Sequence, residues 1–229
     1  MNDGSIINFP LPGETLPFQA KMTTSASPES APIPYRQIRA LYDEEYITVY
    51  QAYSAEIGDA AVAQQRLSAS SSFSYGRMTW IKPSWAWMCY RAGYSYKDDR
   101  QRRILAIKMK HEHLITLLRY AFVDHGAAND AHETVRVQWD PERTPALNKL
   151  PYRSIQIGIP RRLSQQWVEE WIVGIEDVTE KAQGLKRLVD ERPEMSLDEL
   201  VTAGVVPVER PFEIPEDVQA ILKMDRPEE

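Results

Sequence analysis

The residues best suited to chemistry lie between Arg77 and Arg91, where three of the six tryptophans stand beside three cations. Indole rings are costly to leave in water, so each one fills a core or offers a stacking surface. Arginine and lysine heads must stay hydrated or find an anionic partner. This mixture predicts a pocket for a planar, anionic ligand. In it we expect stacking on Trp80 or Trp85, and an anion held by Arg77, Lys82 and Arg91.

Two neutral polar residues accompany this segment. Thr79 offers a hydroxyl within it, and Gln51 interrupts an apolar strand pattern at residues 47–53. A buried glutamine must be hydrogen-bonded, either to the backbone or to a ligand. Both residues are therefore candidates for the site, Thr79 in substrate binding and Gln51 in catalysis.

A second polar cluster, Trp139-Asp-Pro-Glu-Arg143, comes where a predicted strand ends and the chain turns. Asp140 and Glu142 could transfer protons or orient a substrate, and Arg143 could bind an anion. The same residues also suit a simple turn, because Asp-Pro is common turn chemistry and the acids could pair with the basic segment. Both interpretations stay open from the sequence.

The third cluster, Arg153, Ser154 and Gln156, occupies the next predicted strand. Strand alternation puts Ser154, Gln156 and Gly158 on one face. Gly158 would let a ligand or a second backbone approach that face closely. We predict that Arg153 and Gln156 bind substrate there.

Hydrophobic periodicity and capping residues outline the elements that must position these clusters. Strands are predicted at residues 47–53, 78–81, 103–109, 133–139 and 153–159. Helices are predicted at residues 54–67, 84–93, 112–122 and 164–189, with short ones from Ser196 and near Glu216. The helix at 164–189 is expected to be long and amphipathic. Because no glycine fingerprint follows the first strand, we predict an α+β fold with a mixed or mainly antiparallel sheet.

Composition divides the chain into three expected regions. Residues 1–34 are rich in Pro, Ser and Thr and predict a flexible arm, residues 35–190 a single core domain, and residues 191–229 an acidic helical extension. Residues 77–110 hold nine Lys/Arg and two acids, whereas residues 190–229 hold twelve acids and four basic residues. A basic centre suits a nucleotide or RNA, although both regions could also be plain solvated surfaces.

The remaining composition bounds the cellular setting. A chain of 229 residues that is 43% hydrophobic can bury one good core. Cys89 is the only cysteine, which excludes an internal disulfide and fits a reducing compartment. No apolar run is long enough for a membrane span, and no secretory signal opens the chain. We expect a cytoplasmic location and no membrane partner.

Standard catalytic and cofactor signatures are missing. The chain has no phosphate loop, no nucleophile elbow and no dinucleotide-binding turn. His111 and His113 would point apart and lack a nearby third ligand, so no metal site is predicted. Cys89 sits in an apolar helix pattern without a nearby histidine, which favours a buried structural thiol. The sequence leaves the cofactor unidentified.

Several of these segments resemble the family catalogued as domain of unknown function 4291. They are Ile38-Arg-Ala-Leu-Tyr-Asp43, Val49-Tyr-Gln-Ala-Tyr53, Arg77-Met-Thr-Trp-Ile-Lys-Pro-Ser84, Val137-Gln-Trp-Asp-Pro-Glu-Arg143, Arg153-Ser-Ile-Gln-Ile-Gly158 and Trp171-Ile-Val-Gly-Ile-Glu-Asp-Val-Thr179. The resemblance spans residues 35–189 and implies a small, soluble, single-domain protein without an established reaction. Arg91-Ala-Gly-Tyr94 departs from the family pattern, in which Arg-Ser-Gly-Trp is expected.

The combined features predict a transferase that acts on a nucleotide-containing or RNA-linked anionic substrate. One version uses a dinucleotide such as NAD in the manner of an ADP-ribosyl-transferase, with Gln51 and a glutamate near the ribose. The other takes an activated acyl group from a charged transfer RNA. A non-catalytic module that binds nucleic acid or protein is the alternative. The sequence does not rank the two enzymatic versions, and the oligomeric state stays unknown.

Overall fold

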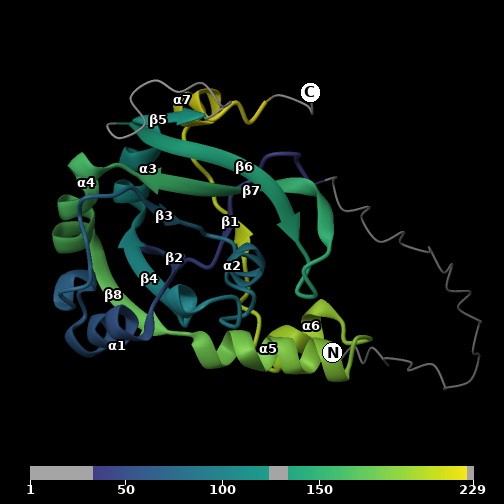
Figure 1. The fold of residues 1–229 in the computed structure, drawn as a ribbon. Coiled ribbons are helices and arrows are strands. Elements are labelled where there is room, and N and C mark those ends of the chain that lie inside the picture. Colours follow the sequence, from purple (N-terminus) through teal and green to yellow (C-terminus); the bar gives the residue numbers. More distant parts are fainter. Residues whose placement is uncertain (1–32, 124–133, 226–229) are drawn as a thin grey trace, which may run out of the picture. The chain divides into compact units, whose positions relative to one another are not determined.

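The computed structural model describes residues 33–123 and 134–225, which is the part of the chain discussed below (Figure 1). Nearly all of the predicted arm at residues 1–34 lies outside the described residues. From Ile33 onward the chain belongs to one unit.

This unit combines helices with short and long strands. The strands are β1 (Arg39–Ala40), β2 (Tyr46–Tyr53), β3 (Thr79–Ile81), β4 (Arg103–Lys110), β5 (Ala121–Val123), β6 (Val135–Arg143), β7 (Lys149–Ile159), β8 (Ile172–Asp177) and β9 (Arg210–Pro211). The helices are α1 (Ala55–Gln64), α2 (Trp85–Ala92), α3 (His111–Arg119), α4 (Arg161–Gln166), α5 (Thr179–Glu191), α6 (Leu197–Thr202) and α7 (Glu216–Ile221). Single turns η1 (Leu67–Ala69), η2 (Asp99–Gln101) and η3 (Trp167–Trp171) connect some of them.

Two main sheets form the scaffold. One has the order β2-β4-β8 and the other β3-β7-β6-β5, and a small third sheet joins β1 to β9. All described pairings are antiparallel except that between β5 and β6. The predicted α+β fold with a mainly antiparallel sheet is confirmed.

The backbones of the two main sheets are joined at the bridge between Tyr50 in β2 and Lys82 just after β3. The Tyr50 amide donates to the Lys82 carbonyl at 2.7 Å, and the Lys82 amide returns a hydrogen bond to the Tyr50 carbonyl at 3.2 Å. Neighbouring residues of a strand point to opposite faces, so Tyr50 and Gln51 face opposite sides of β2. Two pockets, both described below, therefore lie on opposite sides of this junction.

Two hydrophobic clusters cover the two faces of the sheet β2-β4-β8. On one face, Ile47, Val49 and Ile107 belong to the larger cluster, which also contains apolar residues of β6 and β7. On the other face, Tyr50 and Ala106 belong to a smaller cluster with apolar residues of α2, α5 and α6. In Figure 1, α5 and α6 lie together at the end of the unit away from α7. The three-stranded sheet is therefore buried on both faces over most of its length.

Helix α2 forms where the sequence predicted it. The Ser84 hydroxyl caps its start by accepting the Trp87 amide at 3.1 Å, and Gly93 ends it in the left-handed conformation with φ of 54°. Trp85, Met88 and Cys89 are buried along it. The expected buried thiol at Cys89 is thus confirmed.

The prediction of one long helix over residues 164–189 is wrong. α4 ends at Gln166, η3 makes one wider turn, and the chain then extends as β8 before α5 begins. The branched side chains of Ile172, Val173 and Ile175 favour extended backbone. Pairing with β4 supplies the hydrogen bonds that a helix would have made internally, and it buries Ile175. Apolar residues of this segment are buried as the periodicity indicated, but pairing with β4 gives residues 172–177 an extended conformation instead of a helical one.

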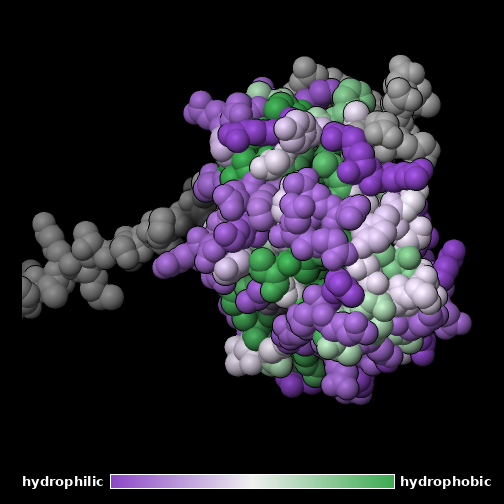
Figure 2. Space-filling view, turned by 90° about the vertical axis from the view of Figure 1, so that its left-hand side faces the viewer, coloured by the Kyte–Doolittle hydropathy of each residue, from purple (hydrophilic) through white to green (hydrophobic). Residues whose placement is uncertain are grey.

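No helix in the described part of the chain is long and apolar enough to cross a membrane. On the face shown in Figure 2, hydrophobic residues form separate patches among hydrophilic ones. This mixture is ordinary for a protein surface and does not by itself mark an interface.

Candidate ligand-binding cleft

A polar cleft of about 490 Å³ opens beside the junction of the two main sheets. Seven of the twelve predicted site residues line it: Gln51, Arg77, Thr79, Trp80, Lys82, Arg91 and Gln156. Residues from β2, β3, α2, β6 and β7 contribute to its walls. The volume is within the range of small-ligand sites.

Gln51 holds one wall of the cleft in place. Its Nε2 donates to Thr79 Oγ1 at 2.6 Å and to the Trp80 carbonyl at 3.2 Å, and its Oε1 accepts the Tyr53 hydroxyl at 3.2 Å. Every donor of this buried amide is therefore engaged by the protein. Gln51 orients Thr79 and the backbone at Trp80, so its role is to position the wall.

Trp80 lies over the polar face of the four-stranded sheet. It pairs with Gly158 of β7, and a Cβ added at Gly158 would come within 3.1 Å of the indole ring and 2.7 Å of Met78 Sδ. Gly158 therefore admits a close approach, as the sequence predicted, but the group that approaches is a side chain of the protein itself. The absence of a side chain at Gly158 sets the position of Trp80 in the cleft.

Lys82 carries the most unusual charge of the cleft. The residue is 5% exposed, and its ammonium donates to the Trp80 carbonyl at 3.3 Å. Burial and, to a smaller extent, nearby Arg91 lower the pKa of Lys82 to about 7, against the opposing effect of Asp140. A bound anion would favour the charged form, so the site is prepared to take up negative charge together with a proton.

The two arginines lie closer to solvent. Arg77 and Arg91 are both exposed, and Arg91 Nη1 donates to Gln101 Oε1 at 3.2 Å. Among the described residues, neither arginine nor Lys82 makes an ion pair with an acid, and no acidic residue lines the cleft. Three cations thus face one hollow without a matching negative charge.

Asp140 stands directly behind the cleft wall. Gln156 Nε2 donates to Asp140 Oδ2 at 2.6 Å and to Gln138 Oε1 at 3.0 Å, which links β7 to β6. Burial raises the pKa of Asp140, while the hydrogen bond from Gln156 and the charges of Arg153 and Lys82 lower it. Asp140 can therefore orient Gln156 and balance part of the charge on Lys82.

The family described as Domain of unknown function (DUF4291) matches residues 37–212. The chain belongs to this family. The resemblance recognised from the sequence is thus confirmed, over a slightly longer span than expected. No curated protein matches the chain.

Five predicted site residues of this DUF4291 member lie outside the cleft lining: Asp140, just described, and Trp85, Glu142, Arg143 and Arg153. Trp85 is the first residue of α2, and its indole belongs to the smaller hydrophobic cluster. There it packs on Tyr50 with ring centroids 5.2 Å apart. Its Nε1 donates to the Val205 carbonyl at 3.0 Å. Trp85 therefore cannot stack on a ligand held by Arg77, because the sheet junction lies between them.

Glu142 and Arg143 lie outside the cleft for a different reason. An irregularity in the pairing of β6 with β7 falls between Pro141 and Arg143, and strand alternation is broken there. Glu142 instead accepts the Ser84 hydroxyl at 2.9 Å at the start of α2. The Arg143 guanidinium lies 3.7 Å from the centre of the Tyr90 ring.

Arg153 is bound near the beginning of the described chain. Its Nε donates to the Tyr35 hydroxyl, and its guanidinium lies 5.3 Å from the centre of that ring. The strand position was predicted correctly, but the packing partner comes from a distant segment that periodicity could not reveal.

Other residues of the cleft were missed by the sequence argument. Gln138 lies two positions before Asp140 on β6, so strand alternation could have placed it on the same polar face. Gln101 comes from the turn η2, and only tertiary contacts bring it to Arg91. In residues 33–123 and 134–225, no group of three or more His, Cys, Asp or Glu side chains is arranged to hold a metal ion.

Proposed function

We propose that this protein is a transferase that binds the phosphate-bearing part of a nucleotide in the polar cleft. The observation that carries the proposal is the convergence of Arg77, Lys82 and Arg91 on a hollow that no acidic side chain lines. Guanidinium groups bind phosphate through paired hydrogen bonds, and the buried ammonium supplies a charge of adjustable protonation. Trp80 offers a ring surface beside them.

A free dinucleotide such as NAD is the substrate that this cleft supports best. Its volume of about 490 Å³ suits a mononucleotide unit with part of a second one. The amides of Gln101, Gln138 and Gln156 are of the kind that recognises ribose hydroxyls and base edges. A helical acceptor stem would need a broader basic surface.

In the transfer step, a nucleophilic atom of a hydroxyl or amine acceptor forms a bond to the anomeric carbon of the ribose. Nicotinamide leaves with the electron pair of the broken carbon–nitrogen bond, which neutralises its ring charge. The proton of the acceptor passes to solvent in the open cleft, while Asp140, which lies behind Gln156 and accepts its amide, holds that amide toward the substrate. The arginines hold the diphosphate throughout.

Calorimetry can test binding without knowledge of the acceptor. We expect NAD and ADP-ribose to bind, uncharged adenosine to bind at least tenfold more weakly, and Arg77→Ala to weaken both phosphate ligands about tenfold. Arg102→Ala, which changes an exposed arginine outside the cleft lining, is the matched control. At pH 8, binding should also take up a proton in the native protein but not in Lys82→Met, which comparison of two buffers would measure.

Turnover separates the possible outcomes. Release of nicotinamide and transfer of labelled ADP-ribose, slowed in Asp140→Asn while binding persists, would support the proposal. Salt-sensitive binding of charged transfer RNA without binding of NAD would favour the acyl-transfer version instead. Binding of nucleotides without any turnover would identify a non-catalytic module. If Arg77→Ala abolished folding instead of weakening ligand binding, Arg77 would have a structural role.

A further inference from the structure

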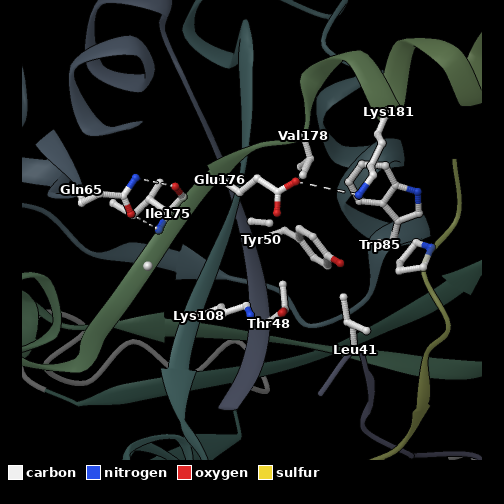
Figure 3. Close-up of a pocket in the computed structure, with 13 residues that line it drawn as sticks. Leu41, Thr48, Tyr50, Gln65, Trp85, Lys108, Ile175, Glu176, Val178 and Lys181 are labelled. Atoms are coloured by element: carbon white, nitrogen blue, oxygen red, sulfur yellow. Dashed lines mark hydrogen bonds and ion pairs between the residues drawn. The ribbon is translucent and has the colours of Figure 1, made fainter. Parts of the chain in front are cut away.

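A second pocket lies on the opposite side of β2 from the cleft, on the outer face of the sheet β2-β4-β8 (Figure 3). Cross-strand pairing builds its floor from two rows of three residues. The first row is Thr48, Lys108 and Gly174, and the second is Tyr50, Ala106 and Glu176. Small residues at Ala106 and Gly174 leave room above the sheet, and a Cβ added at Gly174 would meet nothing within 4 Å.

The pocket has a volume of about 270 Å³ and is walled mainly by apolar groups. Trp85, Val178, Pro207 and Leu41 rise around the floor, and the Trp85 ring packs against Tyr50 on one side. The smaller hydrophobic cluster contains Tyr50 and Ala106 but neither Thr48 nor Lys108. The apolar cover of this face therefore ends before the sheet does, and the hollow begins at that edge.

Two hydroxyls at this site make no hydrogen bond to any described residue. Tyr50 is 2% exposed and Thr48 is 4% exposed, and both side chains line the pocket. Figure 3 shows the Tyr50 hydroxyl pointing into the space between Trp85 and Leu41. Because both side chains line the pocket and neither hydroxyl is engaged by the described protein, the two groups are available to a ligand.

The rim of the pocket carries more positive than negative side chains. Lys181 Nζ lies 3.9 Å from Glu176 Oε1, whereas Lys108 has no ion-pair partner within the described residues. Among the residues that line the pocket, two cations thus stand against one carboxylate. This arrangement complements a molecule with an apolar body and one negative end.

We propose that this pocket binds a small carboxylate with an aromatic or branched aliphatic body. The body lies between Trp85 and the small residues of the floor, the carboxylate reaches Lys108, and the hydroxyls of Tyr50 and Thr48 donate to it. The site is separate from the polar cleft and does not depend on the function proposed for it.

Phenylacetate is the probe, with phenylacetamide and phenethylamine as neutral and cationic relatives of similar shape. We expect saturable binding of phenylacetate with shifts of the amide NMR signals of Thr48, Ala106 and Gly174. Phenylacetamide should bind about fivefold more weakly and phenethylamine not at all, because the rim carries excess positive charge. Lys108→Met should remove the preference for phenylacetate over phenylacetamide.

Gly174→Leu should fill the pocket and weaken phenylacetate binding at least tenfold without disturbing the fold, since its side chain would enter open space. Val173→Leu is the matched control, because Val173 is exposed at the adjacent position of β8 and points to the other face. Arg77→Ala in the cleft should leave phenylacetate binding unchanged. The proposal is overturned if the native protein shows no saturable binding, if Gly174→Leu binds as well as Val173→Leu, or if phenethylamine binds as tightly as phenylacetate.

Discussion

Burial of the Lys82 side chain in the cleft lowers the stability of the folded protein. The buried Lys82 ammonium loses hydration and makes no direct ion pair, and the nearby Arg91 adds repulsion that Asp140 only partly offsets, so its pKa falls from 10.5 to about 7. The backbone of Lys82 is held by Tyr50, which fixes the side chain at the sheet junction. A residue of this kind is typical of binding and catalytic sites.

Lys82 should make the stability of the protein depend on pH. Between pH 7 and 10.5 the unfolded chain holds the Lys82 proton and the folded chain does not, so stability should rise with pH in this window. In Lys82→Met, urea unfolding should show this rise reduced by roughly 5 kcal/mol, since each unit of pKa difference is worth about 1.4 kcal/mol. The variant should also be more stable than the native protein near pH 7.

Lys149→Met provides the comparison, because Lys149 is an exposed lysine at the start of β7. Its pH profile should match that of the native protein. Equal profiles for Lys82→Met and the native protein would mean that Lys82 is solvated, and the argument for an unbalanced charge in the cleft would fail.

At the scale of elements, the close packing of β3 on β7 decides where Trp80 lies. The missing side chain of Gly158 leaves space that the Trp80 ring and Met78 occupy. Other polar residues on this face of β6 and β7, among them Gln138 and Gln156, line the same cleft.

Gly158→Ala should therefore disturb both stability and the cleft. The added methyl would lie 2.7 Å from Met78 Sδ, and overpacking of this kind costs about 1–3 kcal/mol. We expect a lower urea midpoint and a weakened nucleotide affinity. Gly174→Ala is the matched control and should change neither, because its methyl enters open space. Native affinity in Gly158→Ala would show that the position of Trp80 does not matter for binding.

At the scale of the whole described unit, the C-terminal segment is built into the core. β9 pairs with β1, Leu200 of α6 packs in the smaller cluster, and Phe212 and Val218 pack in the larger one. The side chain of Glu209 accepts the Trp85 amide at 2.6 Å at the start of α2. The acidic extension predicted for residues 191–229 thus contacts the segment that carries the cleft cations.

Glu209 should make the stability of the folded protein depend on pH. Burial, with a smaller contribution from the Glu142 carboxylate, raises the pKa of Glu209 to about 8, against the opposing hydrogen bond from the Trp85 amide. Between about pH 4.5 and 8 the folded chain binds more protons than the unfolded one, so this group makes stability fall as pH rises. Glu209→Gln should lessen that fall, which thermal unfolding across this range would measure. Glu213→Gln changes an exposed acid nearby and should leave the profile unchanged.

Local patterns in the sequence were enough for most elements and for part of the cleft. Ser84 and Gly93 marked the ends of α2, and Ile47 to Tyr53 marked β2, because caps and alternation are local properties. The cations between Arg77 and Arg91 were recognised by their spacing, and the structure brings them to one hollow. The cytoplasmic location and the domain boundary near residue 190 stay predictions.

The sequence by itself determined the family, the α+β class and which residue types were present for chemistry. Only the tertiary structure decided that Trp85 faces a different pocket from Trp80, that Arg153 contacts Tyr35, and that residues 172–177 form a strand. The physical reason is that composition and periodicity act over a few neighbouring residues. The pairing of β8 with β4 and the junction at Tyr50 and Lys82 join residues far apart in the chain, and these long-range contacts decide which side chains share a pocket.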